Sequence, residues 1–295
     1  MDILLYSDII EKYLENSHKA LKGPLDLLRS NIFENCENRL ILSKKYIEFL
    51  EQHFSPAHPL HQRFVDFYTE IFDTKSKYVK YDGSPFVTKK DEFEFLYNSH
   101  INNLFVAFTE TIDSASEFQD KIIVSMSQVS KPNPHWLCAT ITANGIASVR
   151  YDDFSDEDQI KIFIEGAISF LRNTKYINIF DRYVNFDSHN RFDCFSESKY
   201  KVHYFTLSTK DANAFYHVSK KIKNKFGTGT KVFHTRNADH IHERAVWGGN
   251  LIVKCDDDFS KINCSTKTWS IEVSFQKDNS MEKLNKKKLL FVEYT

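Results

Sequence analysis

The chain has 295 residues, and its 39 lysines and arginines against 40 acids give a formal net charge of −1. This length predicts two domains of about 150 residues, and the near-neutral charge argues against a generic binder of polyanions. The eight glycines are spaced so that the G-x-G-x-x-G and G-x-x-x-x-G-K-[ST] phosphate loops are excluded, as is the G-x-S-x-G elbow of serine hydrolases. The five cysteines form no C-x-x-C pair, the start lacks a basic leader, and no run of about 18 apolar residues occurs. We therefore expect a cytoplasmic protein without a transmembrane segment.

The first half alternates apolar runs with stretches of helical periodicity. Strands are expected at residues 1–6, 39–43 and 137–141. Helices are expected at residues 8–30, interrupted by Gly23-Pro24, and at 44–54, 91–108 and 117–130. A loop or hairpin is expected at residues 75–90. This alternation predicts an α/β domain over residues 1–150.

The second half has a similar alternation. Strands are expected at residues 176–181, 202–207, 231–236, 249–254 and 268–275. Helices are expected at residues 160–173 and 209–226. The pattern predicts a second α/β domain over residues 151–295, with a parallel sheet completed by an antiparallel portion. The acidic stretch YDDFSDEDQ at 151–159 marks the start of this domain.

Short motifs in the second half resemble those of a known family. They are INIFDRY at 177–183, TLST at 206–209, HIHER at 240–244, GGNL at 248–251 and DDDF at 256–259. In order and spacing they resemble the C-terminal domain of MIT-domain proteins over residues 158–278. That resemblance implies a phospholipase D-like fold. Members of the family bind phosphoinositide membranes and partner proteins, and bacterial relatives occur in defence-type proteins.

The same motifs depart from a phospholipase D active site, which pairs two His-x-Lys segments, each with a following Asp. Here His242-x-Arg244 occurs once, and Gly249 stands where the Asp is expected. Arg is not readily deprotonated and is a bidentate clamp for anions. The resemblance therefore implies recognition of an anion or partner, and the residues expected to carry it are Asp181, Arg182, His240, His242 and Arg244.

Three other interpretations of these residues remain open. Asp181, His242 and Arg244 would equally suit a buried ion-pair network that holds two strand ends together. A phosphodiesterase is a second alternative. A metal site is the third, because His240 and His242 are expected on one face of a strand with His234 nearby, and imidazole is a common metal ligand.

Residues 199–236 form a local cationic stretch, with nine lysines and arginines against one acid, Asp211. Its centre is Lys220, Lys221 and Lys223, and aromatic residues are interleaved. Such a strip suits a nucleic-acid backbone or acidic lipid headgroups. The alternative is a solvated helix face without a ligand.

The first half resembles PIN-domain nucleases in its succession LLYSDIIEKYL, LILSKKYIEFLE and EFQDKIIVSMSQ. The resemblance implies a cluster of carboxylates that holds Mg²⁺ or Mn²⁺, which activates water for phosphodiester cleavage. Asp8, Glu48 (or Glu51) and Asp120 would be the catalytic and metal-binding acids; Asp113 and Glu117 are close to the last. The first acid is displaced from the usual Asp-x-Asn, and a fourth is missing after residue 141. A degenerate scaffold, in which Asp8 caps a helix, Asp120 lies in a helix's first turn and Glu48 faces solvent, is the alternative.

These observations together predict a metal-dependent nuclease acting on RNA or DNA in a bacterial defence or toxin-like system, with a C-terminal recognition domain. The alternative from a different class is a non-enzymatic recognition or adaptor protein that binds a partner protein or anionic lipid.

Overall fold

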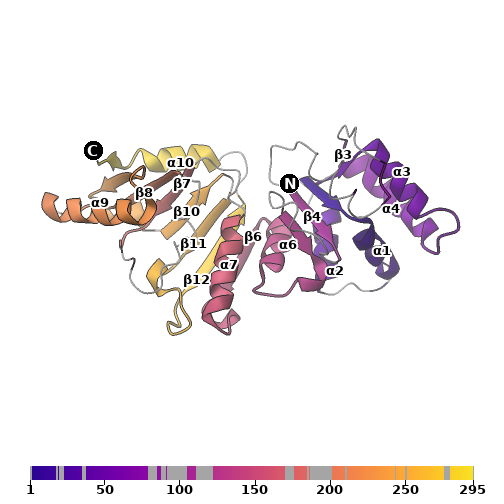
Figure 1. Cartoon of the computed structure of the whole chain (residues 1–295), viewed down its shortest axis with the longest axis horizontal. Helices are drawn as coiled ribbons and strands as arrows, with labels where there is room; N and C mark the ends of the chain where they lie inside the picture. Colours follow the sequence, from indigo (N-terminus) through magenta and orange to yellow (C-terminus); the bar gives the residue numbers. More distant parts are fainter. Residues whose placement is uncertain are drawn as a thin grey trace. The chain divides into compact units, whose positions relative to one another are not determined.

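The computed structural model divides into two compact units, a first unit of Met1–Asn144 and a second unit of Gly145–Thr295 (Figure 1). The described residues are 2–17, 19, 23–34, 38–78, 85–87, 91, 105–110, 122–169, 176–184, 186, 201–209, 211–242, 244–249, 251–275 and 280–294. Both units are α/β, as the sequence predicts. The division falls just before the boundary expected at residue 150.

The first unit is built on a five-stranded parallel sheet in the order β3-β2-β1-β4-β5. The strands are β1 (Asp2–Leu5), β2 (Arg39–Leu42), β3 (Ser76–Tyr78), β4 (Phe105–Thr109) and β5 (Ile122–Ser125). All four residues of β1 are buried, as is typical of a central parallel strand covered on both faces. Strand order reverses between β1 and β4, so the two central strands end side by side.

Helices connect these strands. They are α1 (Ser7–Asn16), α2 (Pro24–Arg29), α3 (Lys44–His53), α4 (His61–Lys75) and α6 (Pro134–Asn144), with a π-helical segment at Ser30–Glu34 after α2. Ser43 begins α3 by accepting a hydrogen bond from the Tyr46 amide at 3.1 Å, which satisfies one of the open donors of the first turn. α2 and α6 pack against each other, while Phe54 after α3 stacks on Phe64 of α4 at 4.5 Å between ring centroids.

Three predictions for the first unit are wrong. The strand expected at 137–141 lies within α6. Residues 105–108 of the helix expected at 91–108 lie in strand β4, and residues 122–125 of the helix expected at 117–130 form strand β5. The earlier parts of both expected helices, residues 92–104 and 117–121, lie outside the described residues. In the range expected to be a loop or hairpin, 75–90, Ser76–Tyr78 form β3, and residues 79–84 and 88–90 lie outside the described residues. α4 was not anticipated.

The second unit has an eight-stranded mixed sheet in the order β13-β9-β8-β7-β10-β11-β12-β6. β7 (Tyr176–Phe180), β8 (Lys201–Leu207) and β9 (Lys231–Thr235) are parallel. β10 (Arg244–Gly248), β11 (Leu251–Cys255), β12 (Ser270–Phe275) and β6 (Ile146–Arg150) continue the sheet antiparallel, and β13 (Val292–Glu293) pairs antiparallel with β9. All five strands expected in this half are therefore present, together with β6, β10 and β13.

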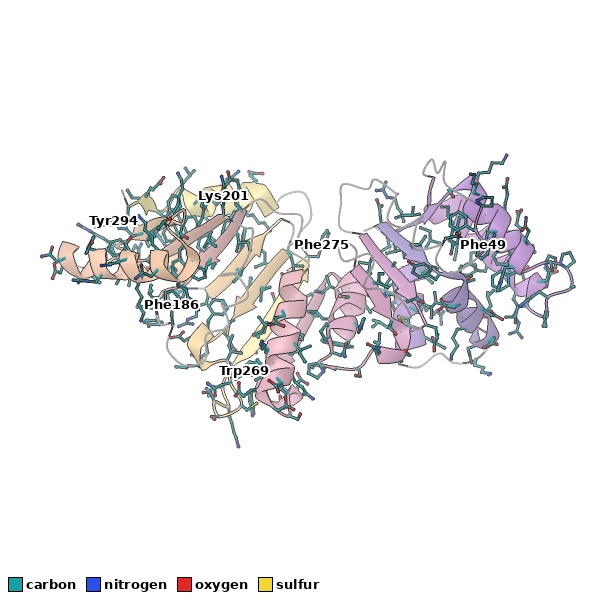
Figure 2. The ribbon with its side chains drawn as sticks, in the orientation of Figure 1. Phe49, Phe186, Lys201, Trp269, Phe275 and Tyr294 are labelled. Carbon is teal, nitrogen blue, oxygen red and sulfur yellow. The ribbon has the colours of Figure 1, made fainter. Side chains whose placement is uncertain are left out.

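Aromatic side chains form much of the second unit's core. Phe180 of β7 stacks on Phe205 of β8 at 4.4 Å, and both contact Phe291. Leu284 brings α10 (Ser280–Lys288) into the same cluster. The helices α7 (Glu157–Ser169) and α9 (Ala212–Phe226) complete the unit. Trp269, before β12, is 1% exposed and donates its indole N–H to the carbonyl of Asn263 (Figure 2).

Candidate functional sites

The carboxyl end of β7 brings together residues that the motifs singled out. Asp181 follows β7 and donates its amide to the carbonyl of Phe205 at 3.0 Å, which continues the parallel pairing with β8. β10 begins at Arg244 and runs antiparallel to β7, with Ala245 opposite Phe180. Arg244 therefore lies beside Asp181 at one end of these strands.

Asp181 is buried, with 1% of its surface exposed. Its carboxylate accepts hydrogen bonds from the Tyr204 hydroxyl at 2.7 Å and from the Tyr183 amide at 3.1 Å. Burial raises the pKa of Asp181 to about 7, although the hydrogen bonds from Tyr204 and Tyr183 oppose that shift. The nearby Asp258 charge adds to the rise, and Arg244 offsets a smaller part of it. This carboxyl group therefore changes charge near neutral pH.

Two guanidinium groups lie against one tyrosine ring next to Asp181. The Cζ atoms of Arg182 and Arg244 are each 5.4 Å from the centroid of the Tyr183 ring, a cation–π distance. We call Arg182, Tyr183 and Arg244 the arginine–tyrosine cluster. Arg244 also donates from Nη1 to the carbonyl of Asp256 at 3.1 Å. Tyr183 is 46% exposed, so the cluster is open to solvent.

The Nε atoms of both arginines are buried yet have no hydrogen-bond partner among the described residues. Buried donors of this kind are uncommon and call for an explanation, such as a bound ion. An arginine holds donors in a planar fork that matches phosphate and carboxylate oxygens. The cluster therefore has the chemistry of an anion site.

The histidines of the HIHER motif are not on a strand, which corrects the prediction. Residues Ala238–Ile241 form a 3₁₀ helix that contains His240, and His242 follows it. Both ring nitrogens of His240 are engaged, Nδ1 with the Thr235 hydroxyl at 3.0 Å and Nε2 with the Asn237 amide at 3.1 Å. These two hydrogen bonds hold the His240 ring against the turn that follows β9.

His242 has 69% of its side chain exposed and faces Asp239 at 3.5 Å. Within the described part of the chain, Asp181, His242 and Arg244 make no ion pair with one another, so the buried network considered as an alternative does not form. His234, His240 and His242 also form no metal-binding group among the described residues.

Four lysines of the cationic stretch lie on α9, namely Lys220, Lys221, Lys223 and Lys225, while Lys201 lies on β8 and Lys231 on β9. Asp211 caps the start of that helix by accepting a hydrogen bond from the Asn213 amide. Phe215 and Ile222 lie on the buried face of the helix. Lys220 and Lys221 are exposed, and Lys223 is half-buried. The Lys221 ammonium lies 5.8 Å from the ring of Phe186. The outward face of α9 is therefore cationic, as expected; Lys199 and Lys210 lie outside the described residues.

Two of the three acids proposed for a nuclease can be placed in the first unit. Asp8 is in the first turn of α1 and is not its N-cap, which is Tyr6. It accepts from the Thr109 hydroxyl at 2.8 Å and from the Glu110 amide at 3.1 Å. Glu48 is exposed on α3 and lies 3.8 Å from Lys44. Asp120, with Asp113 and Glu117, lies outside the described residues, so convergence of the three acids stays a prediction.

Sequence reasoning missed Glu110, the residue directly after β4. Its carboxylate pairs with Lys12 of α1 at 3.2 Å. Asp8 and Glu110 thus follow β1 and β4, the strands where the order of the parallel sheet reverses. Ligands of open parallel α/β sheets bind beyond the carboxyl ends of strands at such a point. The signal in the sequence was an acid directly after the apolar run LFVAFT at 104–109. It was missed because most of that run was assigned to the helix expected at 91–108.

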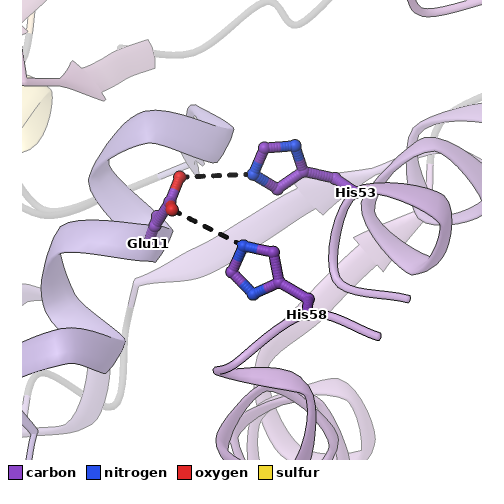
Figure 3. A group of neighbouring side chains, drawn as sticks. All are labelled: Glu11, His53 and His58. Carbon is purple, nitrogen blue, oxygen red and sulfur yellow. Dashed lines mark hydrogen bonds and ion pairs between the residues drawn. The ribbon is translucent and has the colours of Figure 1, made fainter. Parts of the chain in front are cut away.

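The first unit also holds a second group that the sequence did not indicate. Glu11 of α1 faces His53, the last residue of α3, and His58 in the α3–α4 connection (Figure 3). The His53 Nε2 is 3.3 Å from Glu11 Oε2, and the His58 Nε2 is 3.6 Å from Glu11 Oε1. Among the described residues, this is the group of three side chains with metal-ligating atoms close enough to share one ion.

A cleft of about 420 Å³ lies elsewhere in the first unit. Its lining includes Arg29 and Arg63 together with Glu34, Asp66 and Glu70. Burial raises the pKa of Tyr13 in its wall to about 12, so that this phenol stays neutral. Charges of both signs line the cleft, which therefore does not select an anion.

Comparisons with known proteins give no family for this chain. No family model and no curated protein match it. A phosphatidylserine synthase of Haemophilus influenzae Rd KW20 is similar at 11% identity and a TM-score of 0.37, covering 50% of this chain and 40% of that chain. A polyphosphate kinase from Porphyromonas gingivalis is similar at 12% identity and a TM-score of 0.34, covering 49% and 25%.

The archaeal chromatin protein TrmBL2, whose structure shows a novel mode of DNA binding, is similar at 8% identity and a TM-score of 0.33, covering 80% of this chain and 71% of that chain. The chain spans less than half the length of the synthase and the kinase. At these TM-scores none of the three defines its fold or activity. Among the described residues, no helix is both long and apolar enough to cross a membrane.

Proposed function

We propose that this protein recognises nucleic acid, and that the arginine–tyrosine cluster of the second unit binds its phosphate groups. The observation that carries this proposal is the pair of buried Arg182 and Arg244 Nε donors without partners. Phosphate oxygens would satisfy both donors, and the cationic face of α9 would extend the contact along a backbone. The phospholipase D-like, MIT-type fold implied by the motifs is part of this proposal.

Recognition fits the second unit better than hydrolysis does. A phospholipase D reaction needs a nucleophilic histidine and a second histidine as acid. Here His240 is held by Thr235 and Asn237, and His242 is turned to solvent beside Asp239. The two arginines at the end of β7 bind anions and do not exchange protons near neutral pH. Asp181 beside them has a pKa of about 7, but it is 1% exposed and therefore closed to a substrate.

The test is binding of labelled single-stranded RNA and DNA by fluorescence anisotropy at several salt concentrations. We expect the double variant Arg182→Ala, Arg244→Ala to bind more weakly and to lower the salt slope by about 1 for each phosphate group that it no longer binds. The control is Arg150→Ala, because Arg150 at the end of β6 is an arginine of the same unit whose side chain pairs with Asp152. A triple change of Lys220, Lys221 and Lys223 to Ala should weaken binding further.

Vesicles with and without anionic lipid form the second arm of this test. Salt-sensitive binding to anionic vesicles, with none to RNA or DNA, would favour the alternative of a lipid-binding or partner-binding adaptor. If wild type binds none of these ligands, or if the double variant Arg182→Ala, Arg244→Ala binds nucleic acid as wild type does, the proposal fails.

A second candidate function is a metal-dependent nuclease in the first unit. It is favoured by the placement of Asp8 and Glu110 beyond the adjacent ends of β1 and β4. Mg²⁺ or Mn²⁺ held by carboxylates there would supply an activated water and neutralise phosphate charge. A bacterial defence or toxin-like system is the setting that the sequence resemblance suggests for such an activity.

This candidate is tested by incubating the protein with RNA and DNA in Mn²⁺. Cleavage should be removed by EDTA and by Asp8→Asn or Asp120→Asn. Glu48→Gln is the informative comparison: loss of cleavage supports the three-acid site, while retained cleavage assigns the metal to acids at the ends of β1 and β4. Equal, EDTA-insensitive cleavage in all variants would contradict the nuclease.

A further inference from the structure

Glu11, His53 and His58 bring three metal-ligating side chains together, with one ligand atom from each within 4.8 Å of the others. Charge-assisted hydrogen bonds between nitrogen and carboxylate oxygen are about 2.7–2.9 Å long. The two nitrogen–oxygen distances here are 3.3 and 3.6 Å. Ligand atoms on a tetrahedral zinc, with bonds of about 2.0–2.1 Å, are about 3.3–3.4 Å apart. The two distances, each to a different oxygen of Glu11, are near that separation, so small shifts of these side chains would place one ligand atom of each around a single ion.

The two imidazoles are held in place by a buried aromatic side chain. Phe54 is 0% exposed and makes edge contacts with both rings, at 4.7 Å to His53 and 5.2 Å to His58 between centroids. The turn carrying His58 is closed by its own amide, which donates to the carbonyl of Ser55 at 2.7 Å. The His61 ring lies 2.7 Å from the Phe54 carbonyl and fixes the far side of the turn. Both histidines are thus directed toward Glu11 before any ion binds (Figure 3).

The donor set selects the class of metal. Two imidazole nitrogens and one carboxylate are the protein ligands of zinc sites that keep a fourth position for water, whereas Mg²⁺ and Ca²⁺ prefer sites made of oxygen. The side chains of Glu11, His53 and His58 are 37%, 34% and 21% exposed. An ion bound there would be reached from solvent and would keep its fourth position for water.

We propose that Glu11, His53 and His58 form a binding site for a zinc-class divalent transition-metal ion, with water as the fourth ligand. The site would join α1 to the α3–α4 connection. It is independent of the nucleic-acid site in the second unit, and its donor set differs from the carboxylates proposed for Mg²⁺ or Mn²⁺.

Binding changes the protonation of one ring in a way that can be observed. The Leu60 amide donates to Nδ1 of His58 at 3.2 Å, so the neutral ring carries its proton on Nε2, toward Glu11. A metal on Nε2 displaces that proton to Nδ1, and the Leu60 amide then loses its acceptor. Exchange of the Leu60 amide hydrogen with solvent should therefore become faster when zinc binds.

The experiment is calorimetric titration of the full chain with Zn²⁺ and, separately, with Mg²⁺. We expect one zinc ion per chain at this site. The double variant His53→Gln, His58→Gln should weaken that binding by more than about 100-fold, the upper end of the loss that follows removal of an outer partner of a metal ligand. His217→Gln is the control, because His217 is an exposed histidine on α9 of the second unit. Circular dichroism confirms that each variant is folded.

Amide exchange of Leu60, followed by NMR with and without zinc, separates this site from zinc bound elsewhere. Faster exchange in wild type and no change in the double variant support the proposal. The proposal is overturned if wild type takes up no zinc at micromolar concentration, if the double variant keeps wild-type affinity, or if Leu60 is unaffected by bound zinc.

Discussion

Asp181 is a carboxyl group that the fold keeps away from water. Its pKa rises from 3.8 to about 7, chiefly because burial penalises the charged form. The folded chain therefore holds this proton more tightly than the unfolded chain does. Below about pH 4 the carboxyl group is protonated in both states and does not reduce the free energy of unfolding. As the pH rises to 7 the free energy of unfolding decreases, and the full loss, on the order of 4 kcal/mol, is reached above that pH.

We therefore expect Asp181→Asn, which cannot ionise, to reduce the loss of stability between pH 5 and pH 8. Urea unfolding of wild type and variant at both pH values measures this difference. Asp152→Asn is the control, since Asp152 is half-exposed on its side chain and close to Arg150. Equal pH dependence in Asp181→Asn and wild type would show that the buried carboxyl is not responsible.

At the level of residues, the sequence predicted one candidate site and missed another. Asp181, Arg182 and Arg244 could be found because each stands at the end of a strand or within a short motif. Glu11, His53 and His58 could not, because their grouping depends on how α1 meets the α3–α4 connection. That tertiary contact cannot be predicted from the spacing or the type of these residues in the sequence.

At the level of elements, Phe54 connects the end of α3 to α4 and to the zinc-class site. It is 0% exposed, stacks on Phe64 and contacts both histidines. We expect Phe54→Ala to reduce the free energy of unfolding by about 3–5 kcal/mol, because a large buried ring leaves a cavity. Urea unfolding followed by circular dichroism measures the loss.

The control for that substitution is Val65→Ala on α4, at a side chain that is 38% exposed. A change there should remain within about 0.5 kcal/mol. If the two substitutions have the same effect, Phe54 does not anchor the connection. Zinc affinity should also decrease in Phe54→Ala, since the two imidazole rings are no longer held.

Helix α6 shows why some elements could not be predicted. Its residues from Leu137 to Ala143 are all buried, so the helix lacks a polar face and the 3.6-residue period that would reveal it. Pro134 in its first turn and Gly145 after it, at φ 75°, mark its ends. β4 and β5 are short buried strands, which periodicity alone does not distinguish from buried helix segments.

At the level of the whole molecule, β6 decides where the second unit begins. β6 pairs with β12, and its own residues Ala147 and Val149 are buried. Buried and exposed residues alternate along β6, as is typical of a strand with one face on the core. The domain boundary predicted at residue 150 placed β6 in the first domain. That boundary was chosen because the acidic stretch at 151–159 is a stronger compositional signal than the short strand before it.

We expect residues 145–295 to form a folded fragment, and residues 151–295 to be less stable by several kcal/mol. Loss of β6 exposes buried apolar side chains and leaves the N–H and C=O groups of β12 as an open edge prone to association. Thermal unfolding and size-exclusion chromatography of both fragments compare them. Equal melting temperatures and monomeric behaviour of both would mean that β6 is dispensable.

The pairing of β6 with β12 also bears on the order of events while the chain is made. β6 leaves the ribosome with its partner still to be synthesised, because Ser270 follows Arg150 by roughly 120 residues. At about 5–20 residues per second this interval is about 6–24 s. The first unit can complete its sheet during that time, whereas β6 remains a lone strand at risk of pairing with other nascent chains. A chaperone would therefore be needed most during translation of the second half.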